Sequence, residues 1–133
     1  MTHQPLAEIS QLYQSLLKHF GPLNWWPAET PFEVVVGAIL TQNTAWSNVE
    51  KAIQNLNEAN TLTPSAIATL PTNQLEELIH PSGFFRQKAL RLKNISLHLL
   101  EEWQGDLAKL CGGPLDEARS RLLLLSGICL LYT

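Results

Sequence analysis

An apolar run, PFEVVVGAIL from Pro31 to Leu40, passes directly into the polar cluster Thr41-Gln42-Asn43-Thr44, and it constrains this chain more than any other segment. Pro31 suits the first turn of a helix, and Thr30 before it is a candidate N-cap. A helix that is apolar nearly all round has to be buried on most sides. We therefore predict a central helix over residues 31–43 that brings two amide side chains to one surface point. An ordinary polar helix end with its cap would show the same pattern.

The rest of the chain also has helical rather than strand-like periodicity, so the predicted fold class is all-α. The first helix carries its apolar residues on one face and ends at Gly21-Pro22. Ser47, with Glu50 three residues later, forms a capping-box pattern, and Thr72 is another candidate N-cap. Besides the central helix, the predicted helices span residues 9–20, 47–59, 63–70, 72–79, 84–103, 106–111 and 114–125.

Composition narrows the class of protein. With 133 residues, 45% of them apolar and 16% charged, the chain can bury the core of one domain and is not a disordered polymer. A formal net charge of −3 is unlike a typical DNA-binding domain, so any DNA contact needs a local basic face. No apolar run reaches the roughly 18 residues of a membrane span, and the start, MTHQPLAEIS, lacks the features of a signal peptide. We expect a cytoplasmic protein with no membrane partner.

Several segments, in the same order and at similar spacing, resemble the endonuclease III-like DNA glycosylases, which are helix-hairpin-helix enzymes of base-excision repair. The resemblance spans about residues 23 to 128. Trp25-Trp26-Pro27 is similar to the 3-methyladenine glycosylase branch of that family. The other segments that carry the resemblance are Pro31-Phe32-Glu33 with the apolar run, Thr41-Gln42-Asn43-Thr44, Val49-Glu50-Lys51-Ala52, Gly83-Phe84-Phe85-Arg86-Gln87-Lys88-Ala89 and Leu125-Ser126-Gly127-Ile128.

This resemblance implies a single helical domain over residues 1–133. It would consist of an N-terminal helix (1–22), part of a six-helix barrel (23–128) and a disrupted hairpin (125–133). Intact relatives flip a damaged base out of double-stranded DNA and excise it. The implied partner is therefore duplex DNA with a damaged or alkylated base, and a bacterial member would associate with the nucleoid.

The resemblance assigns Gln42 to the space that a flipped nucleotide vacates, since its stem can stack while its amide bonds the orphaned base. Asn43 and Thr44 either face DNA or only cap the helix end. The predicted base pocket is aromatic, because electron-poor methylated purines stack well on aromatic faces. Its candidate walls are Trp25, Trp26 and Trp46. These tryptophans would equally serve to cover the edge of the core.

The basic residues Arg86, Lys88, Arg91 and Lys93 form the one basic cluster of the sequence. They divide over two helix faces, a pattern that favours ordinary solvation over a phosphate-binding stripe. Arg86 and Lys88 remain candidate phosphate ligands, and such binding would weaken steeply with salt. Glu33 is expected at an exposed first helical turn, where the helix dipole favours a carboxylate.

Near the end of the chain, the sequence departs from the hairpin motif of the family. Gly127 would help to cradle a phosphate with backbone amides, but Cys129 stands where the family has its second glycine. We expect a malformed cradle and a truncated member. The positions of the catalytic aspartate, the lyase lysine and the cysteines of the family's iron–sulfur cluster are not found here. The predicted catalytic set, metal set and cofactor are therefore none.

Two alternatives to an impaired glycosylase stay open. The chain could be a binding module that contacts DNA or protein without chemistry, or it could be the remnant of a frameshifted gene. In either case the apolar end, residues 122–125 and 128–131, would expose hydrophobic surface and promote self-association.

Overall fold

The computed structural model describes residues 4–23, 26–125 and 127–128, with side chains from residue 7 onward. Within these residues the chain is helical without strands, which confirms the predicted fold class. The elements are α1 (Gln4–Phe20), α2 (Pro31–Leu40), α3 (Trp46–Glu58), α4 (Pro64–Thr69), α5 (Thr72–Ile79), η1 (His80–Ser82), α6 (Phe85–Trp103), α7 (Leu107–Leu110) and α8 (Leu115–Leu123).

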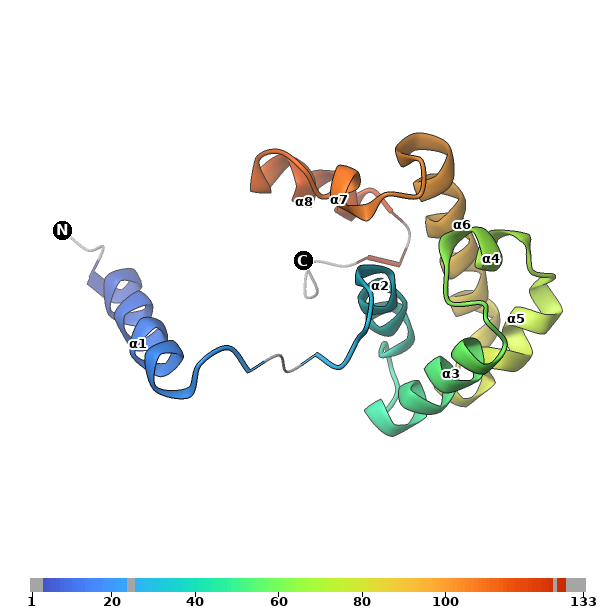
Figure 1. Cartoon of the computed structure of the whole chain (residues 1–133), viewed down its shortest axis with the longest axis horizontal. Helices are drawn as coiled ribbons and strands as arrows, with labels where there is room; N and C mark the ends of the chain where they lie inside the picture. Colours follow the sequence, from blue (N-terminus) through green and yellow to red (C-terminus); the bar gives the residue numbers. More distant parts are fainter. Residues whose placement is uncertain (1–3, 24–25, 126, 129–133) are drawn as a thin grey trace.

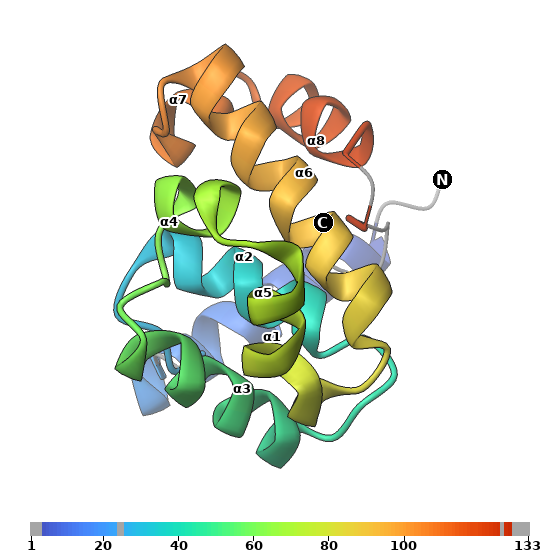
Figure 2. The ribbon, with the colours of Figure 1, turned by 90° about the vertical axis from the view of Figure 1, so that its right-hand side faces the viewer.

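Helices α2 to α6 enclose the hydrophobic core (Figures 1 and 2). The central helix α2 packs against α3 and α6, while α4 and α5 pack along α6 and α7 joins α6 to α8. Val36, Ile39 and Leu40 of α2 are fully buried, as the apolar run predicted. The helix packing does not by itself test the partial six-helix barrel, which stays a prediction.

The predicted starts of these helices lie within one residue of the observed ones, but two of the predicted N-caps are wrong. Thr30 and Thr63 each accept a hydrogen bond from the backbone N–H three residues later, at 3.2 and 3.3 Å. Ser47 does not cap α3, because the helix begins one residue earlier, after an extended Ala45 whose side chain has no oxygen. Thr72 lies inside α5, whose N-cap position is taken by Pro71.

The central helix is three residues shorter than predicted. It ends at Leu40, and Thr41 turns its hydroxyl back to donate a 2.6 Å hydrogen bond to the carbonyl of Gly37. Asn43 adopts a left-handed conformation with φ of 56°, which asparagine tolerates better than most residues. The polar cluster is therefore a turn rather than the last turn of a helix.

Helix α1 lies apart from the body formed by α2 to α8 (Figure 1). It ends at Phe20, as predicted, and Gly21 follows with a φ of +70°. Its apolar face is exposed to solvent, with Ile9, Leu12 and Phe20 at 60% exposure or more. None of the described helices is long and apolar enough to cross a membrane.

Candidate nucleic-acid interface

Gln42 lies in the turn that follows α2, and its amide is bonded at both ends. Its Nε2 donates to the main-chain carbonyl of Gly127 at 2.6 Å. Its Oε1 accepts from Nη1 of Arg91 in α6 at 2.9 Å. The side chain is half-buried. This network joins three segments that are far apart in the sequence, and sequence reasoning gave no sign of the part that Arg91 plays in it.

The two polar residues after Gln42 differ in their surroundings. Asn43 is exposed, whereas Thr44 is half-buried and its Oγ1 accepts a 3.2 Å hydrogen bond from Asn48 Nδ2 in α3. Thr44 therefore links the turn to the start of α3. Asn43 remains open to a partner at the tip of the turn.

An aromatic hollow lies next to this turn. The indoles of Trp26 and Trp46 meet edge to face, with ring centroids 5.5 Å apart and planes at 73°. Together with Pro27 and Thr41 they line a hollow of about 370 Å³. This volume lies within the usual range of small-molecule sites. Trp25, the third predicted wall, lies outside the described residues.

A glycine in α2 permits the approach of Trp26. A Cβ added to Gly37 would lie only 3.3 Å from Cζ2 of Trp26, closer than an ordinary van der Waals contact. Glycine in a helix costs roughly 1 kcal/mol relative to alanine. Glycine at position 37 therefore lowers the stability of α2 but lets the indole of Trp26 lie against the helix backbone. Thr41, one turn later, lines the same hollow.

Carboxylates surround the other side of Trp46. A second hollow, of about 270 Å³, is lined by Trp46, Pro27, Glu33, Glu50 and Glu58 among others. Glu50 Oε1 accepts a 3.1 Å hydrogen bond from the indole N–H of Trp46 and fixes the ring. The expectation that Glu33 is exposed is wrong, since it is 7% exposed. Its carboxylate accepts the N–H of Glu29 at 3.0 Å, so it completes the cap that begins with Thr30.

The basic cluster does not form a solvated surface. Lys88, predicted to be an ordinary solvated cation, is only 1% exposed. Its Nζ donates to the carbonyls of Leu40 at 2.8 Å and Ser82 at 2.7 Å. Burial lowers the pKa of the Lys88 ammonium, and the nearby Arg91 guanidinium lowers it further. A lysine held in this way closes the C-terminal end of α2, so we leave it out of the phosphate-binding surface.

The other members of the basic cluster also have internal roles. Arg91 binds Gln42, and Lys93 donates to the carbonyls of Ile67, Ala68 and Leu70 at the end of α4. Arg86 is exposed and lies over the Phe85 ring at 5.8 Å. Of the four, only Arg86 projects from the body as a solvated cation.

Gly127 lies where the resemblance sets the hairpin, with a φ of +97° that favours glycine. Cys129 and Ser126 lie outside the described residues, so the malformed cradle stays a prediction. Among the residues that the structure describes, no group of three or more His, Cys, Asp or Glu side chains could hold a metal ion.

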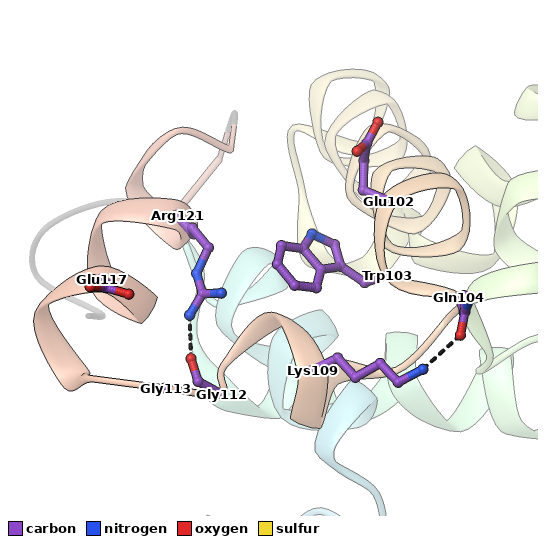
Figure 3. A pocket seen from close by; sticks show the side chains of 8 residues that line it. All are labelled: Glu102, Trp103, Gln104, Lys109, Gly112, Gly113, Glu117 and Arg121. Atoms are coloured by element: carbon purple, nitrogen blue, oxygen red, sulfur yellow. Dashed lines mark hydrogen bonds between the residues drawn. The ribbon is translucent and has the colours of Figure 1, made fainter.

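A larger hollow lies elsewhere, between α6, α7 and α8 (Figure 3). It measures about 520 Å³, and Arg121 lies over the Trp103 ring at 5.1 Å while bonding the carbonyl of Gly112. Its lining mixes Glu102 and Glu117 with basic side chains, and it shares no residue with the aromatic hollow. We favour the smaller aromatic hollow as the ligand site, because it adjoins the turn that carries Gln42 and is lined by two indoles.

Comparison with known proteins fits this geometry. A family model described as "HhH-GPD superfamily base excision DNA repair protein" matches residues 36–124. The chain is 44% identical over 130 residues to "Putative DNA repair glycosylase MJ1434" of Methanocaldococcus jannaschii, covering 96% of this chain and 59% of that relative. It is 34% identical over 120 residues to endonuclease III of Thermotoga maritima, covering 90% and 51%.

Solved structures agree. The crystal structure of H. pylori 3-methyladenine DNA glycosylase (MagIII) bound to 1,N6-ethenoadenine matches with a TM-score of 0.72 and 32% identity, covering 97% of this chain and 60% of that one. An endonuclease III trapped as a covalent intermediate with DNA has the same fold, with a TM-score of 0.62 at 23% identity.

The chain spans about three fifths or less of the length of these relatives. The resemblance to endonuclease III-like glycosylases, including the 3-methyladenine type, is confirmed. Because the family model covers more than half of the sequence, this chain belongs to the HhH-GPD superfamily of base excision DNA repair proteins.

Proposed function

We propose that this chain recognises a damaged base in double-stranded DNA. The observation that carries the proposal is the adjacency of a wedge and a pocket. Thr41 lines the hollow between Trp26 and Trp46, and the next residue in the chain is Gln42. A side chain that enters the duplex and a pocket that receives the expelled base have to be neighbours, and the turn after α2 carries the candidate wedge beside a residue of the candidate pocket.

The wedge step rests on Gln42. Extrusion of a nucleotide costs a few kcal/mol of lost stacking and pairing. A glutamine that fills the vacated space offsets part of this cost, because its methylenes stack and its amide bonds the orphaned base. Asn43, exposed at the tip of the turn, would contact the strand beside it.

The pocket step favours an electron-poor, alkylated purine. A cationic ring is attracted to the face of an indole, and Glu33, Glu50 and Glu58 add negative charge on the far side of Trp46. The MagIII relative, 32% identical, was solved with 1,N6-ethenoadenine. A modified purine is therefore the ligand class that this hollow supports best.

The described residues favour binding without base release. The carboxylates nearest Trp46 already accept hydrogen bonds, Glu33 from the Glu29 backbone and Glu50 from the indole. Both carboxylates thus have a structural partner, and we assign neither a catalytic role. We therefore retain an empty catalytic set for these residues, and recognition rather than excision is the proposed activity of this chain.

The test combines two measurements on the purified 133-residue chain. Fluorescence anisotropy at low salt should give a lower Kd for duplex DNA with one alkylated purine than for the same duplex undamaged. Single-turnover base release should not exceed a heat-killed control. Equal Kd values for both duplexes would refute the recognition. Base release would refute the binding-only part and make Glu33 the first residue to substitute.

A second proposal concerns self-association through the apolar C-terminal end. Leu124 is 86% exposed, beside half-buried Leu122, Leu123 and Leu125. Exposed apolar patches of this kind mark contact surfaces. Sedimentation equilibrium measures this self-association directly. In a bacterial cell, a chain that binds duplex DNA would associate with the nucleoid, and it would do so as an oligomer.

A further inference from the structure

The direction of the Gln42 amide follows from the chemistry of its two partners. A guanidinium group has only donors and a main-chain carbonyl only accepts. The amide oxygen therefore has to face Arg91 and the NH₂ group has to face Gly127. A reversed amide would set two donors against each other at Arg91 and two acceptors at Gly127. Arg91 thus selects one of the two orientations of Gln42.

Arg91 is itself held in place. It is half-buried on α6, and the backbone at Gly127 runs along its aliphatic stem. A Cβ added at Gly127 would approach Arg91 Cδ to 2.8 Å, a distance that forces a shift. The guanidinium is therefore packed between the Gly127 segment and the turn after α2. This packing makes it a fixed partner for Gln42 rather than a mobile surface cation.

We infer that Arg91 is a positioning residue that determines which orphaned base Gln42 accepts. The inference rests on the proposed function, in which Gln42 enters the duplex. With its oxygen turned to Arg91 in α6, Gln42 has its NH₂ donor on the opposite side, and this donor is the group that meets the orphaned base. When Gln42 enters the duplex, its NH₂ group leaves the Gly127 carbonyl and donates to an acceptor on the orphaned base. The hydrogen bond from Arg91 to the Gln42 oxygen is kept.

A wedge that presents its NH₂ donor discriminates between bases. On the minor-groove side, thymine O2 and adenine N3 are acceptors, whereas guanine adds its N2 amino donor. An orphaned guanine would then bring its N2 amino donor against the Gln42 donor, beside its own N3 acceptor. A net hydrogen bond contributes about 0.5–1.5 kcal/mol, which corresponds to roughly threefold to tenfold in Kd. Orphaned thymine should therefore be bound that much more tightly than orphaned guanine.

The experiment measures Kd by anisotropy for duplexes with a tetrahydrofuran abasic analogue opposite thymine or guanine. The full chain is compared with Arg91→Met, Arg91→Lys and Arg86→Met, after circular dichroism shows that each is folded. Arg86→Met removes the same charge from an exposed site on the same helix and should weaken both duplexes equally. Arg91→Met should bring the thymine-to-guanine ratio within about twofold of one, and Arg91→Lys, which keeps a donor, should preserve part of it.

The outcomes separate the inference from the proposed function. A wild-type chain that binds the alkylated duplex no more tightly than the undamaged one refutes the proposed function, and the inference falls with it. A wild-type chain that binds both orphaned bases equally, or an Arg91→Met variant that keeps the ratio, refutes the inference alone. A merely structural Arg91 would lower both affinities together and leave their ratio unchanged.

Discussion

Lys88, in the first half of α6, donates a 2.8 Å hydrogen bond to the main-chain carbonyl of Leu40, the last residue of α2. The same ammonium donates to Ser82 in η1 at 2.7 Å. One buried side chain thus satisfies two carbonyls in different elements. The turn that carries Gln42 begins at the residue after Leu40, so Lys88 supports the proposed interface from beneath.

Replacing Lys88 by methionine should destabilise the fold. The carbonyls of Leu40 and Ser82 would lose their donor, and each unsatisfied buried group costs about 1–3 kcal/mol. We expect the free energy of unfolding, measured by urea denaturation, to fall by roughly 2–4 kcal/mol. Lys51→Met, at an exposed position in α3, is the matched control and should change it by less than about 0.5 kcal/mol. Similar losses in the two variants would contradict this role for Lys88.

The ionisation of Lys88 should also shape the pH dependence of stability. Burial, and then the Arg91 guanidinium, lower the pKa of Lys88 from its ordinary 10.5 in the folded state. Between the lowered pKa and 10.5 the unfolded chain binds more protons than the folded one, so this contribution to stability rises with pH. The uncharged amine still has two N–H donors for its two carbonyls.

The measurement is the difference in unfolding free energy between wild type and Lys88→Met, followed from neutral pH upward. This difference cancels the groups that both proteins share. It should grow as the pH approaches 10.5. A flat or falling difference would show that the folded state does not favour the uncharged amine.

Local features of the fold were predictable from the sequence, while contacts between distant segments were not. Thr30 and Thr63 cap their helices because the donor lies three residues away in the same chain. The burial of Lys88 depends on Leu40, which lies 48 positions away. The hydrophobic periodicity of a sequence does not predict a contact between residues this far apart. A lysine on an amphipathic helix is usually solvated.

The same limit applies to the candidate site. The indoles and Gln42 were found from their residue types and their order, because the family resemblance covers both segments. Arg91 was assigned with the solvated cations, since its partner Gln42 lies 49 positions earlier. The sequence predicts Thr41 inside the central helix, whereas α2 ends at Leu40 and Thr41 lines the hollow.

Duplex binding by this chain should depend weakly on salt. Of the basic cluster, Lys88, Arg91 and Lys93 bind groups inside the protein, and Arg86 remains exposed. Each neutralised phosphate contributes about −0.9 to the slope of log K against log salt. We expect a slope of about −1 to −2, reduced by about 1 in Arg86→Met. Lys109→Met, on α7, should leave it unchanged, and a slope steeper than about −4 would require phosphate contacts other than those we propose.

The aromatic hollow predicts selective loss on substitution of Trp46. Stacking of a base on an aromatic side chain contributes about 1–3 kcal/mol. Trp46→Leu should therefore reduce the preference for alkylated over undamaged duplex by at least about fivefold. Trp103→Leu removes an indole from the larger hollow, which shares no residue with this one, and should leave the preference intact. A preference that survives Trp46→Leu would place the expelled base elsewhere.

Helix α1 offers a second apolar surface for self-association besides the C-terminal end. Ile9, Leu12, Leu16 and Phe20 share one exposed face, with exposures between 48% and 63%. Such a stripe is the pattern of a helix that packs against another apolar surface. Leu12→Glu with Leu16→Glu should therefore shift a concentrated sample toward monomer in sedimentation equilibrium. Gln11→Glu with Gln14→Glu adds the same charge to the polar face and should not.

Leu124→Glu distinguishes the two surfaces. If the C-terminal end alone mediates association, only Leu124→Glu will yield monomers, since its side chain is 86% exposed beyond α8. If α1 mediates it, the Leu12 and Leu16 variant alone will do so. A wild-type chain that sediments as a monomer at all concentrations would exclude both surfaces as contacts between copies and direct attention to a different partner for α1.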